Sequence, residues 1–89
     1  MTVKNFMLTV TIYSTTTCPF CKMEKTYLEE KGIAFTNIFV DEQPEKVGEM
    51  VEKSGQMGVP VTVISTDGKE EVVLGFDRDR LNTLLGILS

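Results

Sequence analysis

Histidine is absent from the sequence, which excludes histidine-dependent catalytic triads, histidine-ligated zinc proteases and imidazole pH switches. Cysteine is scarce, and two residues are too few for a disulfide-stapled mini-protein or for a Cys-only zinc site within one chain. No apolar run approaches the roughly 18 residues that a membrane-spanning helix needs. Nine Lys and Arg against 13 Asp and Glu give a net charge of −4, so neither nucleic acid nor an anionic membrane is an expected partner. The chemistry must therefore depend on carboxylates, amines, hydroxyls or the two cysteines.

A chain of 89 residues is expected to form a single domain over residues 1–89. Hydrophobic residues make up 42% and charged residues 25%, a balance typical of globular proteins. The apolar stretch near the N-terminus is short and is not followed by a small-residue cleavage site, so we interpret it as a strand rather than a signal peptide. We therefore expect a cytoplasmic monomer, in which two cysteines would be catalytic or metal-binding rather than a structural disulfide.

In the first half of the chain, the spacing of apolar residues changes from a strand pattern to a helix pattern and back. Alternating apolar residues predict a strand over residues 8–13, and a helical period follows from Pro19, which suits the first helical position. Gly32 is the predicted stop of this helix. Its apolar side chains are predicted to form one face, with Glu and Lys on the other: Phe20, Met23, Tyr27 and Leu28.

Residues 33–40 return to a strand-like composition, and a second helix is predicted to follow. Asp41 is its expected N-cap, and Pro44 lies in its first turn. Its buried stripe is predicted to contain Val47, Met50 and Val51. Its exposed face is predicted to carry two i,i+4 ion pairs, Glu42–Lys46 and Glu49–Lys53.

The last third predicts a β-hairpin and a helix. Strands are expected at residues 59–64 and 72–74, joined by a turn at Asp67-Gly68. Asp77 can cap the final helix. The apolar stripe of that helix is predicted to contain Leu81, Leu84, Leu85 and Leu88.

The predicted order is therefore β-α-β-α-β-β-α. A strand–helix–strand start implies a parallel pair with a right-handed crossover, and the hairpin adds an antiparallel pair. The predicted fold is of the α/β class, a four-stranded mixed sheet with helices on both faces.

One motif carries recognisable chemistry, the segment Cys18-Pro19-Phe20-Cys21 at a strand-to-helix junction. The i,i+3 spacing brings both thiols to the first turn of the helix, where free N–H groups and the helix dipole favour a thiolate. Such a site typically lowers the pKa of a thiol from about 8.5 to about 7 or below. Cys18 should be exposed and should attack a substrate disulfide. Cys21, one turn further, should be sheltered and less acidic, and should resolve the mixed disulfide.

Two other interpretations of the motif remain open. Zinc and cluster half-sites share its spacing, so the protein could be an iron–sulfur cluster or metal carrier assembled from two chains. The two cysteines could also act in a redox-responsive interaction domain without turnover. Neighbouring residues carry alternatives as well: Lys22 could stabilise the thiolate or be a solvated side chain, and Asp77 could be a helix cap or a ligand contact.

The chain resembles the glutaredoxins, which have a thioredoxin fold. The resemblance lies in residues 13–22, in Gly58-Val59-Pro60 and in Gly75-Phe76-Asp77. It implies a cis proline at Pro60 beside the nucleophilic cysteine, with the backbone of Val59 offered to the substrate. It also implies protein-disulfide reduction with no bound cofactor. The implied substrate- or glutathione-binding residues are Thr17, Phe20, Lys22, Gln56, Val59, Pro60, Gly75, Phe76 and Asp77.

The chain departs from the glutathione-using members at three positions. Thr15 stands where they usually have Lys, Arg78 where an acid is expected, and Phe20 where Tyr is more usual. The Gly-Phe pair followed by Asp and Arg residues is similar to the NrdH-type redoxins, which take electrons from thioredoxin reductase and pass them to ribonucleotide reductase. The resemblance therefore implies glutathione or thioredoxin reductase as the electron donor, with the departures favouring the reductase, and ribonucleotide reductase as a candidate target among disulfide-containing proteins.

Overall fold

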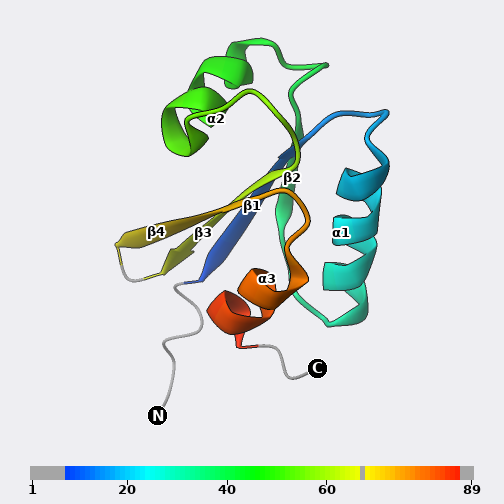
Figure 1. The fold of residues 1–89 in the computed structure, drawn as a ribbon, viewed down its shortest axis with the longest axis vertical. Helices are drawn as coiled ribbons and strands as arrows, with labels where there is room; N and C mark the ends of the chain where they lie inside the picture. The colour runs from blue at the N-terminus through cyan, green and yellow to red at the C-terminus, as the bar shows by residue number, and fades with distance from the viewer. Residues whose placement is uncertain (1–7, 67, 87–89) are drawn as a thin grey trace.

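The computed structural model describes residues 8–66 and 68–86, and it confirms the predicted order of strands and helices (Figure 1). The elements are β1 (Thr9–Ser14), α1 (Pro19–Glu30), β2 (Thr36–Phe39), α2 (Glu45–Ser54), β3 (Val61–Thr66), β4 (Lys69–Leu74) and α3 (Arg78–Leu85). Within the described residues, no helix is both long and apolar enough to cross a membrane.

The four strands form one mixed sheet in the order β2-β1-β3-β4. The β1–β2 pair is parallel and the β3–β4 hairpin is antiparallel, as predicted. The β1–β3 pair, which the sequence did not specify, is antiparallel. Thr66 pairs with Lys69 across the hairpin, and Gly68 has a φ of +82°, a value that glycine adopts without strain. Asp67 of the predicted turn and Leu88 of the predicted last stripe lie outside the described residues.

The sheet buries a different cluster on each face. Alternate residues of a strand point to opposite faces, so Val61 and Val63 of β3 pack with Met50 of α2, whereas Ile64 packs with Leu28 of α1. Helices α1 and α3 therefore cover one face and α2 covers the other.

The predicted helix ends are confirmed for α1 and α3. Pro19 is the first residue of α1, and Gly32 follows its C-cap residue with a φ of +72°. The Asp77 carboxylate accepts a hydrogen bond from the backbone N–H of Arg80 (3.1 Å) and caps α3. A side-chain cap of this kind satisfies one of the four free N–H groups at a helix start.

The predicted apolar face of α1 is confirmed at Tyr27 and Leu28, which are buried, and is wrong in its first turn. Phe20 and Met23 are 59% and 51% exposed. The buried residues are Cys21, Glu24, Tyr27 and Leu28. The prediction failed because it kept every charged residue at the surface, whereas the sheet side of α1 includes Glu24.

The predicted start of α2 is also wrong. The helix begins at Glu45, after Pro44 in the cap position, and no side chain caps it. The Asp41 carboxylate instead accepts hydrogen bonds from the backbone N–H and the hydroxyl of Thr16 (3.1 and 2.6 Å). Asp41 therefore ties the β2–α2 connection to the loop after β1. Of the predicted stripe, Met50 is buried, whereas Val47 and Val51 are half-buried.

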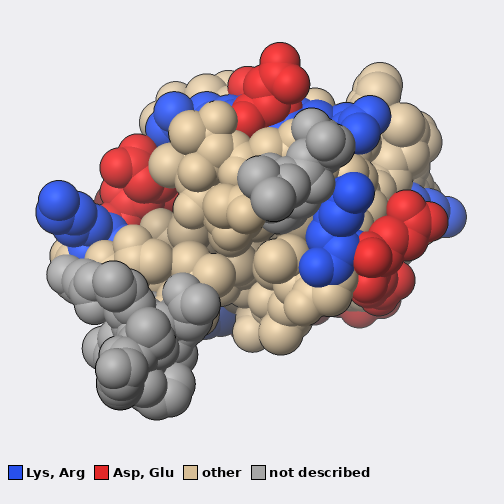
Figure 2. All heavy atoms as spheres, turned by 90° about the horizontal axis from the view of Figure 1, so that it is seen from below, with Lys and Arg blue, Asp and Glu red and all other residues tan. Residues whose placement is uncertain are grey.

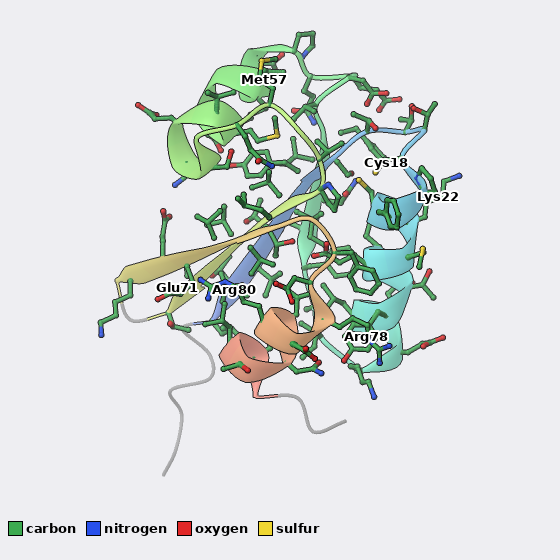
Figure 3. The ribbon with its side chains drawn as sticks, viewed as in Figure 1. Cys18, Lys22, Met57, Glu71, Arg78 and Arg80 are labelled. Atoms are coloured by element: carbon green, nitrogen blue, oxygen red, sulfur yellow. The ribbon has the colours of Figure 1, made fainter. Side chains whose placement is uncertain are left out.

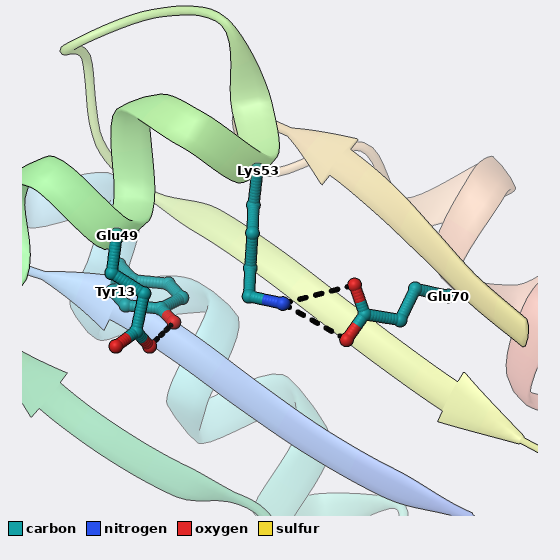
Figure 4. A network of polar contacts seen from close by, with 4 residues as sticks. All are labelled: Tyr13, Glu49, Lys53 and Glu70. Carbon is teal, nitrogen blue, oxygen red and sulfur yellow. Dashed lines mark hydrogen bonds and ion pairs between the residues drawn. The ribbon is translucent and has the colours of Figure 1, made fainter. Parts of the chain in front are cut away.

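The ion pairs of α2 differ from the predicted i,i+4 pairs. Lys46 pairs with Glu49 (3.4 Å), and Lys53 reaches across to Glu70 on β4 (3.0 Å). Figure 4 shows this second pair beside Tyr13, whose hydroxyl donates to Glu49. Lys53 finds its partner on another element because α2 lies over the sheet, a placement that helical spacing alone does not specify.

Candidate active site

Cys18 is the N-cap residue of α1 and lies between β1 and the helix (Figure 3). Its Sγ accepts a hydrogen bond from the backbone N–H of Cys21 (3.2 Å), and its carbonyl accepts one from Lys22 (3.2 Å). The sulfur therefore occupies the place that a Ser or Asp oxygen takes in an ordinary cap. Its side chain is half-buried rather than exposed as predicted, because the sulfur folds back onto the helix start, and both cysteines are free thiols.

Cys21 lies one turn into the helix and is fully buried. Burial, followed by its interaction with Cys18, raises the pKa of the Cys21 thiol to about 12, although the backbone of Thr15 and the charge of Lys25 lower it. The prediction that Cys21 is the more sheltered thiol of the pair is confirmed. Two thiols in such different surroundings are suited to different steps of one exchange reaction.

The loop that leads into Cys18 is held at both ends. The backbone N–H of Cys18 donates to the carbonyl of Thr15 (3.4 Å), and Thr16 is bound by Asp41. The hydrogen bonds from Thr16 are the main reason that the pKa of Asp41 is lowered. Thr17 is exposed. The role of Asp41 was missed because its position after a strand also suits a helix cap.

The Val59–Pro60 peptide bond is cis, as the resemblance implied. Pro60 is buried, and its carbonyl accepts a hydrogen bond from the backbone N–H of Gly75 (2.9 Å). Gly75 has a φ of +74°, a left-handed conformation that favours glycine. The structure therefore joins two of the predicted site segments. Gln56 is half-buried just after α2, where its backbone N–H donates to Ser54 Oγ (3.2 Å).

An open groove lies between α1 and the segment that leads into α3. Figure 3 shows Lys22 near Cys18 and Arg78 towards the other end of α1. The Phe76 ring lies 5.8 Å from the Tyr27 ring, and the Arg78 guanidinium lies 4.8 Å from the Tyr27 ring on its face. The groove has a volume of about 380 Å³ and is lined by Lys22, Met23, Thr26, Tyr27, Glu30, Phe76 and Arg78. Met23 in this groove and Phe20 in the first turn of α1 are exposed apolar side chains.

The predicted site residues fall into two groups. Lys22 and Phe76 line the groove, and Pro60 and Gly75 meet through the backbone. The Asp77 carboxylate is engaged as a helix cap. On the face shown in Figure 2, acidic and basic side chains are interspersed rather than gathered into a patch of one sign.

Glu24 is a feature of the site region that sequence reasoning missed. It is the one charged side chain that is buried in the described part of the chain. Thr62 on β3 donates its hydroxyl to Oε2, whereas Oε1 has no hydrogen-bond partner. Burial raises the pKa of Glu24 to about 7, and the Thr62 hydrogen bond acts in the opposite direction. The sequence signal for this burial was the spacing, since Glu24 lies three residues after Cys21 and so on the same face of the helix.

Residues 8–66 and 68–86 contain no cluster of three or more His, Cys, Asp or Glu side chains placed to hold a metal ion.

Comparisons with known proteins agree with this site. The glutaredoxin family model matches residues 10–69, which include both cysteines and Pro60. A glutaredoxin-like 8.6 kDa protein of Clostridium pasteurianum is 40% identical over 76 residues, which cover 85% of this chain and 96% of that protein. The crystal structure of a glutaredoxin from Archaeoglobus fulgidus superposes with a TM-score of 0.73 at 30% identity, covering 91% of this chain and 89% of that one.

A second solved structure connects the chain to the redoxins. It is the glutaredoxin-like protein NrdH-redoxin from Escherichia coli, described as having a thioredoxin-like activity profile. It aligns with a TM-score of 0.68 at 33% identity over 84% of this chain and 92% of its own. The chain therefore belongs to the glutaredoxin family of thiol–disulfide oxidoreductases, which have the thioredoxin fold.

Proposed function

We propose that this protein reduces disulfide bonds of other proteins through a dithiol cycle at Cys18 and Cys21. The observation that carries the proposal is the contrast within one helical turn. Cys18 caps the helix with a half-buried sulfur that accepts an N–H hydrogen bond, and Cys21 is buried with a raised pKa. An accessible sulfur at a helix N-terminus is the better attacking group.

The cycle has two exchange steps. The Cys18 thiolate attacks one sulfur of the substrate disulfide, forms a mixed disulfide and releases the first substrate thiolate. Cys21 then attacks Cys18 Sγ, which releases the second substrate thiolate and leaves a Cys18–Cys21 disulfide. The two electrons that reduce the substrate come from this thiol pair, so an external dithiol or two thiols must restore it.

The surroundings of the pair favour a protein substrate. The groove that starts at Lys22, the residue after Cys21, exposes mainly apolar surface, and Phe20 and Met23 expose half or more of their surface. Apolar patches of this kind are typical of protein contact sites. We propose that the substrate also meets the predicted contact residues, namely Thr17, Phe20, Lys22, Gln56, Val59, Pro60, Gly75, Phe76 and Asp77.

We propose a flavoprotein reductase, thioredoxin reductase, as the electron donor, with glutathione as the alternative. Asp77 holds the start of α3, and Arg78 lies over Tyr27, so the surface where glutathione-using relatives present acids carries a cation here. The thioredoxin-like activity profile of the NrdH-redoxin from Escherichia coli points in the same direction. We propose that the reaction takes place in the cytoplasm and that ribonucleotide reductase is a candidate target.

The test offers the oxidised protein two electron sources in parallel. One arm contains glutathione with glutathione reductase, the other thioredoxin reductase, and NADPH oxidation is followed in both with a protein disulfide as the final acceptor. We expect turnover in the reductase arm and its loss in Cys18→Ser. Cys21→Ser should instead accumulate a mixed disulfide, visible by mass spectrometry. Full turnover by Cys18→Ser would contradict the proposal.

A matched pair of variants tests the choice of donor. Thr15→Lys and Arg78→Asp restore the residue types of glutathione-using relatives, so together they should raise the rate in the glutathione arm. An unmodified protein that already uses glutathione faster than the reductase would overturn the proposed donor and leave the thiol chemistry intact.

A further inference from the structure

The buried carboxyl of Glu24 is not explained by the packing of the fold. Its side chain is fully buried, and Oε1 lacks a hydrogen-bond partner. An unpaired buried oxygen is costly and rare in native proteins. An aliphatic residue would fill the same space without the free-energy cost of burying an ionisable group, so packing alone does not account for a carboxyl here.

Glu24 shares the buried face of α1 with Cys21. Residues three apart on a helix have Cβ atoms about 5–6 Å apart. Helical side chains also lean toward the N-terminus and cover the preceding turn, so the Glu24 side chain is expected to lean toward the turn that contains Cys21. In the reduced protein no hydrogen bond joins its free oxygen to that thiol. Thr62 holds Oε2 from β3, so Oε1 is the oxygen left for a second partner.

Few other polar groups compete for this carboxyl. The cluster under α1 is aliphatic where β1, β3, β4 and α3 contribute to it, namely at Val10, Ile12, Ile64, Val73 and Leu81. On α1 itself, the Tyr27 hydroxyl donates to Asn82, and the Lys25 ammonium lies over the Phe39 ring. The hydroxyl of Tyr27 and the ammonium of Lys25 are thus engaged elsewhere, and Thr62 is the hydrogen-bond partner that the structure shows for Glu24.

We propose that Glu24 accepts the proton of the Cys21 thiol when Cys21 attacks the mixed disulfide, and returns it when the disulfide is reopened. The inference rests on the proposed dithiol cycle and assigns the proton transfer within its second step. In the forward direction the S–H bond of Cys21 breaks, a Cys21–Cys18 bond forms, the substrate thiolate leaves, and the Glu24 carboxylate becomes a carboxylic acid. When the reductant thiol attacks Cys18, the departing Cys21 thiolate takes the proton back.

The acidities of the two groups make the transfer useful. With the pKa of Cys21 at about 12, only about one molecule in 100,000 carries a Cys21 thiolate at neutral pH. With the pKa of Glu24 at about 7, about half of the molecules carry an ionised Glu24 at that pH. A base close to half ionised is matched to accept a proton under these conditions.

The test separates the two steps with dithiobis(nitrobenzoate), an aromatic disulfide whose thiolate product is coloured. Attack by Cys18 releases the first coloured thiolate, and attack by Cys21 releases the second. In stopped flow at neutral pH we expect Glu24→Gln to keep the first phase and to slow the second about a hundredfold. The exposed Glu29→Gln, on the same helix, is the matched control and should change neither phase.

The pH profile distinguishes a proton acceptor from a structural residue. The second phase of the wild type should rise with pH and level off above about pH 7, as Glu24 becomes ionised. In Glu24→Gln it should rise about tenfold per pH unit with no such plateau. A Glu24→Gln second phase with the wild-type rate and profile would overturn the inference. A wild-type profile without an inflection would overturn it too, even if the variant does not fold.

Failure of the proposed function has a different signature. If Cys18 were not the attacking thiol, the first phase would persist in Cys18→Ser. If only the role of Glu24 were wrong, the first phase would still require Cys18, and the rate of the second phase would be the same in Glu24→Gln as in the wild type.

Discussion

The two faces of the sheet each hold a glutamate that accepts a hydrogen bond from a hydroxyl, yet the pKa values of the two shift in opposite directions. Glu24, under α1, accepts from Thr62, and burial raises its pKa to about 7. Glu49, on α2, accepts from Tyr13, and its pKa is lowered by that bond and by Lys46 and Lys53. A hydrogen bond to the ionised carboxylate therefore gives a net lowering of its pKa only where water or a cation also reaches the carboxylate.

The same contrast separates the two thiols. Cys18 lies at the solvent end of the first turn of α1, and Cys21 lies in the layer that buries Glu24. On the α2 face, charged groups remain hydrated and pair with each other, as Lys53 and Glu70 do (Figure 4). Ionisation is costly at buried groups on both faces, since burial also raises the pKa of Tyr13 on the α2 face. Among the described residues, the face under α1 is the one that buries both a thiol and a carboxyl group.

The largest expected effect is on the pH dependence of stability at Glu24. Its pKa is 4.5 in the unfolded chain and about 7 in the fold, so the folded state binds the proton more tightly and stability falls as pH rises between these values. At about 1.4 kcal/mol per pH unit, the loss approaches about 3 kcal/mol by pH 8. Urea unfolding of wild type and Glu24→Gln at pH 5 and pH 8 should show this difference. An equal change in both proteins would refute it.

A smaller effect is expected when the donor to Glu24 is removed. Thr62→Val deletes the hydroxyl that lowers the pKa of Glu24, so that pKa should rise by about one unit. The midpoint of the stability loss should move to higher pH by the same amount. Infrared titration of the protonated carboxyl band would measure it, and an unchanged midpoint would mean that the bond is not made to the ionised form.

On the other face the sign should reverse. Glu49 has a lowered pKa, so its contribution to stability is present above the unfolded pKa and is lost as pH falls through the folded value. Thermal unfolding of Glu49→Gln should approach the wild type under acidic conditions and fall below it near neutrality. If Glu49→Gln were instead more stable than the wild type near neutrality, as Glu24→Gln should be, the two faces would not differ in this way.

The smallest effect is expected for the Lys53–Glu70 ion pair. Both side chains are substantially exposed, at 31% and 46%, and exposed pairs contribute about 0.5 kcal/mol. A double-mutant cycle with Lys53→Met and Glu70→Gln should return a coupling energy of that size, which high salt should abolish. A coupling that survives high salt would indicate that this face is drier than its exposure implies.

Sequence patterns predicted what depends on local chemistry. The alternation around residues 8–13, Pro19 at the helix start and the Asp77 cap each involve neighbours in the chain, and each is confirmed. The cis bond at Pro60 followed from the family resemblance, because residue letters alone do not specify that isomer.

The failures share a different cause, since each depends on contacts between distant segments. Asp41 suits a helix cap, but Thr16, 25 residues earlier, binds it instead. Glu24 suits a solvated helix face, but the sheet buries it against Thr62, 38 residues later. Polar residues have several local uses, and only the tertiary arrangement selects among them. For that reason the thiol pair was predictable and its buried carboxyl was not.

The most direct test of the account is the rate at which each thiol of the reduced protein is alkylated. Iodoacetamide would be added near neutral pH, and the modified cysteine would be mapped by mass spectrometry over time. Because Cys18 is accessible at the helix N-terminus and Cys21 is buried with its proton retained, we predict modification of Cys18 with Cys21 left intact. Alkylation of Cys21 at the same rate as Cys18, or faster, would contradict the division of roles on which the proposed cycle depends.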